Sequence, residues 1–241
     1  MTYFFDGTKT GFLTAFTKAF LDQDAILTSK QAQLLLGSPP ITIKSDESLA
    51  RRAEERLLSF DRYCMHDLDR LLRCGEEGNE QIAFRYLRKL ALQKKPIGNR
   101  LADEDVFSAV TLLKKVGFEI HRLHGFVRFM ETASGALYAP ISPDNDIVDL
   151  LLPHFKARLP NYPFVLHDVI RKKVAVYDGK NTFNAYLPHA DVILSADEEG
   201  WKNLFKTYYH AVNIPSRERL RQMKNYMPTR YWKHMPEKED G

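Results

Sequence analysis

Residues 126–139 read FVRFMETASGALYA, and their apolar spacing differs from the helical spacing before them. Residues 126–130 resemble a β-strand, and the small and polar residues 132–135 are typical of a turn. Residues 136–139 then lead back as a second strand. The stretch therefore predicts a β-hairpin.

The pattern repeats downstream, with a helix in between. Residues 143–146, Pro-Asp-Asn-Asp, are typical of a helix start, and apolar residues follow at helical spacing up to Leu159. Residues 163–167 and 173–177 are two further apolar strands. A hairpin, a helix and a second hairpin in this order predict an antiparallel sheet with one helix packed on a face. We therefore expect an α+β fold with a helical layer and C-terminal helices.

Most of the remaining chain has helical spacing. We expect a helical subregion over residues 45–96 and a sheet-centred region over residues 119–232. A chain of 241 residues fits one domain of generous size or a core domain with a helical insertion, and we expect a single domain over residues 1–241. Further strands are expected at 3–5 and 41–43, and further helices at 10–22, from 103 or 104 to about 120, at 198–214, and from 215 or 216 to about 226.

Composition and charge restrict the possible classes of protein. The chain has 241 residues, a formal net charge of +4 and a pI of about 8.9, which permits nucleic-acid binding without requiring it. Cys64 and Cys74 are too few for a disulfide scaffold or for an iron–sulfur cluster, so we expect reduced thiols. No apolar run approaches the roughly 20 residues of a membrane span. We expect a cytoplasmic protein with no cofactor and no membrane partner.

Residues 202–235 combine cations with aromatic rings. Eight basic side chains against the single acid Glu218 give this stretch a formal charge of +7. Cationic groups neutralise phosphates, and rings stack on exposed bases. The alternative is an exposed basic helix whose rings face the core. The residues expected at nucleic acid are Arg217, Arg219, Arg221, Lys224, Arg230 and Lys233, which would contact phosphates, and Tyr226, Tyr231 and Trp232, which would stack or anchor the helix.

Two histidines share one face of an expected helix. His121 and His124 are three residues apart, and a third ligand from His154, His167 or Asp168 would complete a metal site of nitrogen and oxygen ligands. Because the sequence fixes no third ligand, we expect no metal. We interpret the histidines instead as polar residues beside a site or along a DNA backbone.

A further group of polar residues lies on the expected strands and on the helix between them. Converging on the sheet, they would form a cationic pocket with a carboxylate, suited to a phosphate or to a general acid–base step. The alternative is that Asp168 pairs with an arginine and orders the hairpin. The group is Arg128, Glu131, His154, Arg158, Asp168 and Arg171, and the candidate catalytic residues are His121, His154, Asp168, Arg128, Arg158 and Arg171.

Spaced motifs carry a resemblance to a known family. They are Glu119-x-His121-Arg122-x-x-Gly125-Phe126-x-Arg128-Phe129, Leu137-Tyr138-Ala139, Pro143-Asp144, His154-Phe155-x-x-Arg158, Asp168-x-x-Arg171 and Met227-Pro228-x-Arg230-Tyr231-Trp232, with Tyr3-x-x-Asp6-Gly7 and Gly11-Phe12-Leu13 near the N-terminus. In this order they resemble a bacterial family of DNA metabolism and repair proteins. Members of that family look like companions of a radical-SAM protein related to spore photoproduct lyase. Some are fused to a uracil-DNA-glycosylase-like domain.

Three hypotheses about function follow. The first is a DNA-binding accessory or repair protein with a radical-SAM partner, as the resemblance implies. The second is a hydrolase or nucleotide-processing enzyme, metal-dependent or not, that uses His121, His154 and Asp168. The third is a protein-interaction subunit with no affinity for DNA. The sequence shows no short phosphate-loop, dinucleotide, serine-hydrolase or zinc-protease motif that would name a reaction.

Overall fold

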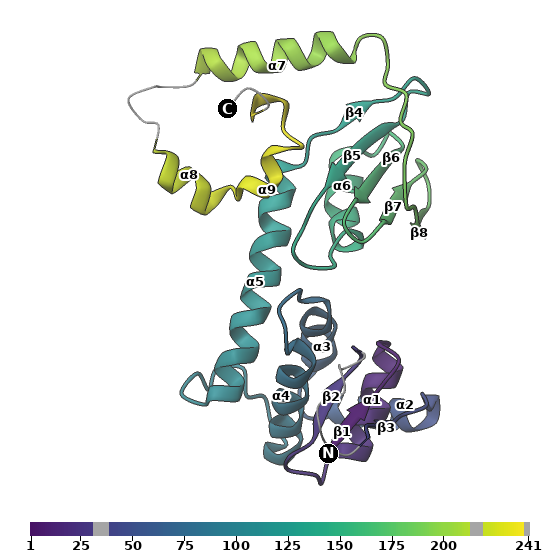
Figure 1. Ribbon diagram of the computed structural model, residues 1–241, viewed down its shortest axis with the longest axis vertical. Coiled ribbons are helices and arrows are strands. Elements are labelled where there is room, and N and C mark those ends of the chain that lie inside the picture. Colours follow the sequence, from purple (N-terminus) through teal and green to yellow (C-terminus); the bar gives the residue numbers. More distant parts are fainter. Residues whose placement is uncertain (31–38, 213–218, 239–241) are drawn as a thin grey trace. The chain divides into compact units, whose positions relative to one another are not determined.

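The computed structural model describes residues 1–30, 39–212 and 219–238. The chain divides into two units, Met1–Val116 and Gly117–Gly241, and each has its own β-sheet (Figure 1). The expectation of a single domain stays a prediction, because this division does not show whether the units unfold together.

A parallel three-stranded sheet lies in the first unit, in the order β2-β1-β3. Strand β1 (Thr2–Phe4) pairs with β2 (Ile26–Thr28) on one side and with β3 (Ile41–Thr42) on the other. Helix α1 (Lys9–Ala19) connects β1 to β2, since parallel neighbours need a crossover connection. The strand β2 was not expected from the sequence.

Helices and aromatic rings complete this unit. The ring of Phe12 meets Phe5 edge-on at 5.7 Å, and Phe16 meets Phe84 in the same manner at 5.9 Å. The helical layer expected over residues 45–96 is present. Its helices are α2 (Glu47–Leu58), α3 (Cys64–Arg73) and α4 (Asn79–Gln93), and they are followed by α5 (Glu104–Phe126), which continues into the second unit.

A mixed five-stranded sheet lies in the second unit, in the order β4-β5-β6-β7-β8. Its neighbours are antiparallel except for β5 and β6, which are parallel. A short 3-10 turn, η1 (Asp149–Leu151), and helix α6 (Leu152–Arg158) connect these two strands. The strands are β4 (Met130–Glu131), β5 (Leu137–Ile141), β6 (Phe164–Asp168), β7 (Lys173–Tyr177) and β8 (Thr182–Tyr186).

The predicted fold class is wrong. The protein is a mixed α/β structure with one parallel and one mixed sheet, and its sheets are not antiparallel hairpin sheets. Both expected hairpins exist, as β4–β5 and β6–β7. The chain between them crosses over through α6, however, so that Leu137 pairs with Phe164 and Ile141 with Asp168 in parallel register. The helix spacing gave no sign of which direction the following strand would take.

Packing on the second sheet comes from a cluster of rings. Phe129 lies 5.1 Å from Phe155 of α6 and 5.5 Å from Phe164 of β6, with the rings edge-on in both pairs. Helix α5 runs to Phe126, so the strand expected at 126–130 is reduced to β4. Strand β8 adds an exposed edge that was not expected.

The C-terminal part of the second unit is helical. Helix α7 contains most of the helix expected at 198–214, whose last residues lie outside the described part. The start expected at 215 or 216 also lies outside it. The helices are α7 (Glu198–Val212), α8 (Leu220–Tyr226) and α9 (Thr229–Trp232), followed by the 3-10 turn η3 (Pro236–Lys238). Among the described helices, none has the length and apolar character needed to cross a bilayer.

Candidate nucleic-acid interface

Helix α8 presents cations to solvent. Arg219, Arg221 and Lys224 are exposed, and Tyr226 at the end of the helix is 66% exposed. Among the described residues, the ion pairs of the segment 219–235 involve Arg230 and none of these three cations. The segment thus offers positive charge that no described carboxylate neutralises.

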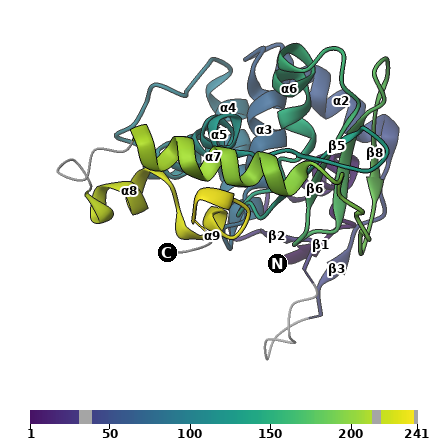
Figure 2. The ribbon, with the colours of Figure 1, turned by 90° about the horizontal axis from the view of Figure 1, so that it is seen from above.

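Helix α7 exposes an apolar face. Trp201, Leu204, Phe205 and Tyr208 follow one another at the spacing of a single helix face, and their exposed fractions are 58%, 59%, 36% and 60%. At the start of the helix, a carboxylate oxygen of Glu198 accepts the Glu131 N–H at 2.7 Å, which ties α7 to strand β4. In Figure 2 the helix runs alongside the chain that contains α9 and η3.

A cavity of about 680 Å³ lies along this face. Helix α7, strands β4 and β5 and the segment 233–236 supply its walls. Its volume is in the range of about 300–1,000 Å³ that is common for ligand sites. The aromatic residues at the cavity are Phe129, Trp201, Phe205 and Tyr208, and the charged ones are Arg128, Glu131, Glu198, Lys202 and Lys233.

Some of these charges are already engaged. The guanidinium of Arg128 pairs with the buried Glu237 at 2.7 Å and lies 5.4 Å from the ring centre of Phe205. His234, also at the cavity, shares a hydrogen bond of 2.8 Å with Ser142, and burial lowers the pKa of its imidazole to about 4. The side chains of Lys202 and Lys233 have no ion pair with a described carboxylate, so they add positive charge at the cavity.

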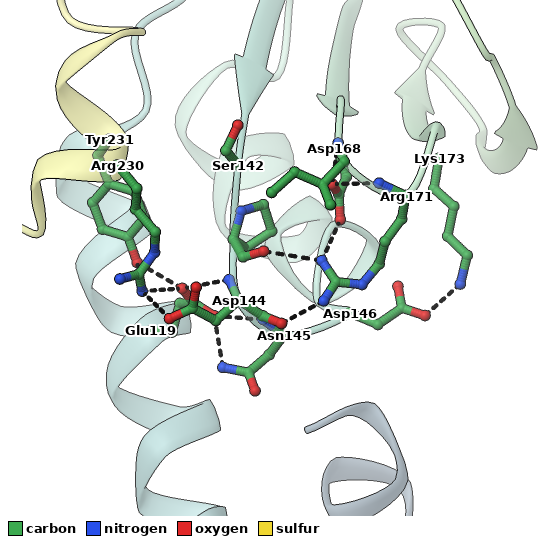
Figure 3. A network of polar contacts seen from close by, with 12 residues as sticks. Glu119, Ser142, Asp144, Asn145, Asp146, Asp168, Arg171, Lys173, Arg230 and Tyr231 are labelled. Carbon is green, nitrogen blue, oxygen red and sulfur yellow. Dashed lines mark hydrogen bonds and ion pairs between the residues drawn. The ribbon is translucent and has the colours of Figure 1, made fainter. Parts of the chain in front are cut away.

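Arg230 and Tyr231 face the interior. Glu119 of α5 is 2% exposed and accepts hydrogen bonds from Arg230 at 2.7 Å and from the Tyr231 hydroxyl at 2.8 Å (Figure 3). It also accepts the backbone N–H groups of Asp144 and Asn145 at 3.0 and 2.9 Å. Burial alone would raise the pKa of Glu119, but these hydrogen bonds hold it below its ordinary value.

Asp168 and Arg171 hold the turn between β6 and β7. The buried Asp168 carboxylate accepts the N–H groups of Ile170 and Arg171 and pairs with the Arg171 guanidinium at 3.0 Å. Arg171 also donates to the backbone carbonyls of Pro143 and Asp144 (Figure 3). This arrangement matches the alternative in which Asp168 orders the hairpin.

The histidines do not form a metal cluster in the described structure. His124 of α5 and His154 of α6 stack with ring centres 4.0 Å apart, and the buried Nε2 atom of each has no hydrogen-bond partner. His121 is exposed on α5, and Arg158 is exposed at the end of α6. Within residues 1–30, 39–212 and 219–238, no three His, Cys, Asp or Glu side chains lie close enough together to hold a metal ion.

A model of a protein family matches residues 77–237, which is more than half of the chain. The chain belongs to the DUF4130 family. This family is described as a domain of unknown function. No curated protein and no solved structure matches the chain. The part of the DUF4130 chain that matches includes α7, α8, α9 and the cavity, whereas the parallel sheet of the first unit precedes it.

Of the six candidate catalytic residues, only Asp168 and Arg171 are joined by a described hydrogen bond or ion pair, and the enzyme hypothesis stays a prediction. Arg217 lies outside the described residues. Trp232 is half-buried, and its indole N–H donates to the Met227 carbonyl at 3.1 Å.

Sequence reasoning missed two features of this region. It expected a helix over residues 198–214 but named none of that helix's apolar residues as a binding residue, and it gave Glu119 no role. The apolar residues of α7 carried a usable signal, because two aromatic positions, Tyr208 and Trp201, alternate with lysines in a basic segment. Glu119 carried none, because its partner Arg230 lies 111 residues away.

Proposed function

We propose that this DUF4130 chain is a DNA-binding accessory protein of DNA repair, which contacts DNA through helix α8 and the residues around it. The observation that carries the proposal is the exposed group of Arg219, Arg221 and Lys224 beside the exposed ring of Tyr226. Cations release counterions when they meet phosphates, and an exposed ring can stack on a base. The exposed Lys233 adds to the same charge.

The contacts of Arg230, Tyr231 and Trp232 support a different role for these residues. Glu119 holds the first two, and the Met227 carbonyl holds the third. We therefore propose that Arg230 and Tyr231 anchor α9 to α5, that Trp232 anchors α9 to the end of α8, and that these contacts fix where the α8 cations lie. The proposed phosphate contacts are Arg219, Arg221, Lys224 and Lys233.

Fluorescence anisotropy across a salt series tests this function. The wild-type protein should bind a labelled oligonucleotide with a Kd of about 1 μM or tighter at low salt, and the binding should weaken steeply as salt rises. The triple variant Arg219→Gln, Arg221→Gln, Lys224→Gln should reduce the slope of log K against log salt by up to about 3, since each lost phosphate contact removes about one unit.

The matched control removes the same charge elsewhere. Lys44, Arg52 and Arg85 are exposed cations of the first unit, and replacing all three with Gln should leave the slope unchanged. Equal slopes for the two triple variants would show that net charge alone matters and would contradict contact through α8. Absence of binding by the wild-type protein at low salt would overturn the proposal.

We also propose a radical-SAM protein as the partner, and the support for it is the resemblance of the spaced motifs. Cys64 and Cys74 are both buried and free, so any cluster chemistry would belong to the partner. The radical-SAM companion from the same organism should co-elute with this chain in gel filtration. Separate elution at concentrations of about 10 μM, well above a specific Kd, would contradict the partnership.

A further inference from the structure

The rings on α7 have faces that no described ring covers. Trp201 takes part in no ring pair among the described residues, and Phe205 and Tyr208 are 6.4 Å apart and tilted by 43°, so they do not stack on each other. The Arg128 guanidinium lies over Phe205. The broad, exposed rings of Trp201 and Tyr208 therefore remain available at the cavity.

The charge around these rings indicates the chemistry of an occupant. Lys202 follows Trp201 on the helix, and Lys233 of the C-terminal segment also lines the cavity. Two carboxylates also line the cavity: Glu131 is half-buried, and Glu198 is buried and accepts the Glu131 N–H. A flat apolar group attached to an anion fits such a site, because the rings would stack on the one and the lysines would attract the other.

We propose that the cavity beside α7 takes an unstacked base of a single DNA strand. Trp201 and Tyr208 would stack on the base, and Lys202 and Lys233 would meet the phosphates on either side. The proposal rests on the proposed function, since the same C-terminal part of the chain would bind the strand. A duplex keeps the faces of its bases stacked and hidden, so the occupant is a base of a single strand.

Two oligonucleotides with the same number of phosphates test this site without any mutation. One is an oligothymidylate of about 12 nucleotides, a length within the usual site sizes, and the other is an abasic strand of equal length. The wild-type protein should bind oligothymidylate about ten-fold or more tightly than the abasic strand, because stacking on aromatic side chains strengthens binding to about that degree.

Substitutions at the cavity then test whether its aromatic residues cause the tighter binding of the strand that has bases. Trp201→Ala and Tyr208→Ala should each bring the ratio of the two affinities toward one, and Trp201→Phe should restore much of it. Tyr162→Ala is the matched control, because Tyr162 is 55% exposed and is not among the cavity residues. It should leave the ratio unchanged. Salt slopes should remain the same in the aromatic variants.

The outcomes separate this proposal from the function on which it rests. Equal affinity of the wild-type protein for the two strands would overturn the base site, while salt-dependent binding of both would leave the α8 contact standing. No binding of either strand or of duplex would overturn both. An unchanged ratio in Trp201→Ala, together with a dimer that this substitution dissociates, would assign the α7 face to a second copy of the chain and overturn the base site.

Discussion

At the scale of single residues, Glu119 determines the roles of two other side chains. An arginine and a tyrosine in a basic, aromatic stretch are typical nucleic-acid contacts, yet Arg230 and Tyr231 both donate to this one buried carboxylate. A buried carboxylate is stable only when hydrogen bonds replace its water. Glu119 therefore requires these partners, and they in turn are drawn inward.

Replacing Glu119 with Gln should destabilise the protein by about 2–3 kcal/mol, because it leaves Arg230 partly buried without its main anion. Urea unfolding measures the loss. The matched control is Asp144→Asn, because the Asp144 carboxylate also lies 2.7 Å from Arg230 but is 61% exposed. That change should lower the free energy of unfolding by less than about 1 kcal/mol, because exposed ion pairs contribute little to stability. Equal losses in the two variants would contradict the dominant role of the buried partner.

At the scale of elements, two helices meet through their histidines. His124 of α5 stacks on His154 of α6, and neither buried Nε2 atom has a hydrogen-bond partner. Burial lowers the pKa of His124, and the nearby His154 and His121 lower it further. Contact between α5 and α6 thus favours the neutral form of the ring.

This contact predicts that acid weakens the fold. An unfolded histidine has a pKa of about 6.5, so the unfolded state binds protons that the folded state resists. The free energy of unfolding that the neutral histidines contribute should be fully present above about pH 6.5. It should fall as the pH drops toward the pKa values of these histidines in the folded state. His234, with a folded pKa of about 4, should extend the loss to about pH 4. The urea midpoint at pH 7.5 and at pH 5 measures the effect.

A substitution can measure how much of this loss of stability in acid comes from the α5–α6 contact. His124→Phe keeps a ring in the stack and removes the titrating group, so the drop in urea midpoint between pH 7.5 and pH 5 should become smaller. His189→Gln is the control, because the His189 side chain is 82% exposed and its change should leave the drop nearly intact. A drop that is identical in His124→Phe and in the wild type would remove this helix contact from the explanation.

At the scale of the whole molecule, we expect the two units to unfold together. Helix α5 passes from the first unit into the second without a break. If one unit unfolded alone, the part of α5 that belongs to it would lose its packing. We therefore expect the chain to unfold in one cooperative transition. Both tryptophans, Trp201 and Trp232, belong to the second unit and report on it alone, whereas far-ultraviolet circular dichroism reports on both units. The two signals should change at the same urea concentration. Transitions that differ in midpoint would show two domains.

Local spacing predicted many of the elements but not their partners. The strands at 163–167 and 173–177 and the helices from 45 to 96 are present, because periodicity and turn residues act over a few neighbours. Strand direction is a property of pairs that are far apart in the sequence. The parallel pairing of Leu137 with Phe164 therefore could not be deduced from the hairpins on either side, and the predicted antiparallel sheet was wrong.

The sequence by itself determined the chemistry that the chain carries, which is a mildly basic protein with cations and rings concentrated between residues 202 and 235. Only the tertiary structure decided which of these groups face solvent. Glu119 draws Arg230 and Tyr231 inward, while Arg221 and Lys224 stay exposed. The physical reason is that a buried charge needs a counter-charge, and Glu119 and Arg230 find theirs in each other across 111 residues, a pairing that sequence spacing does not encode.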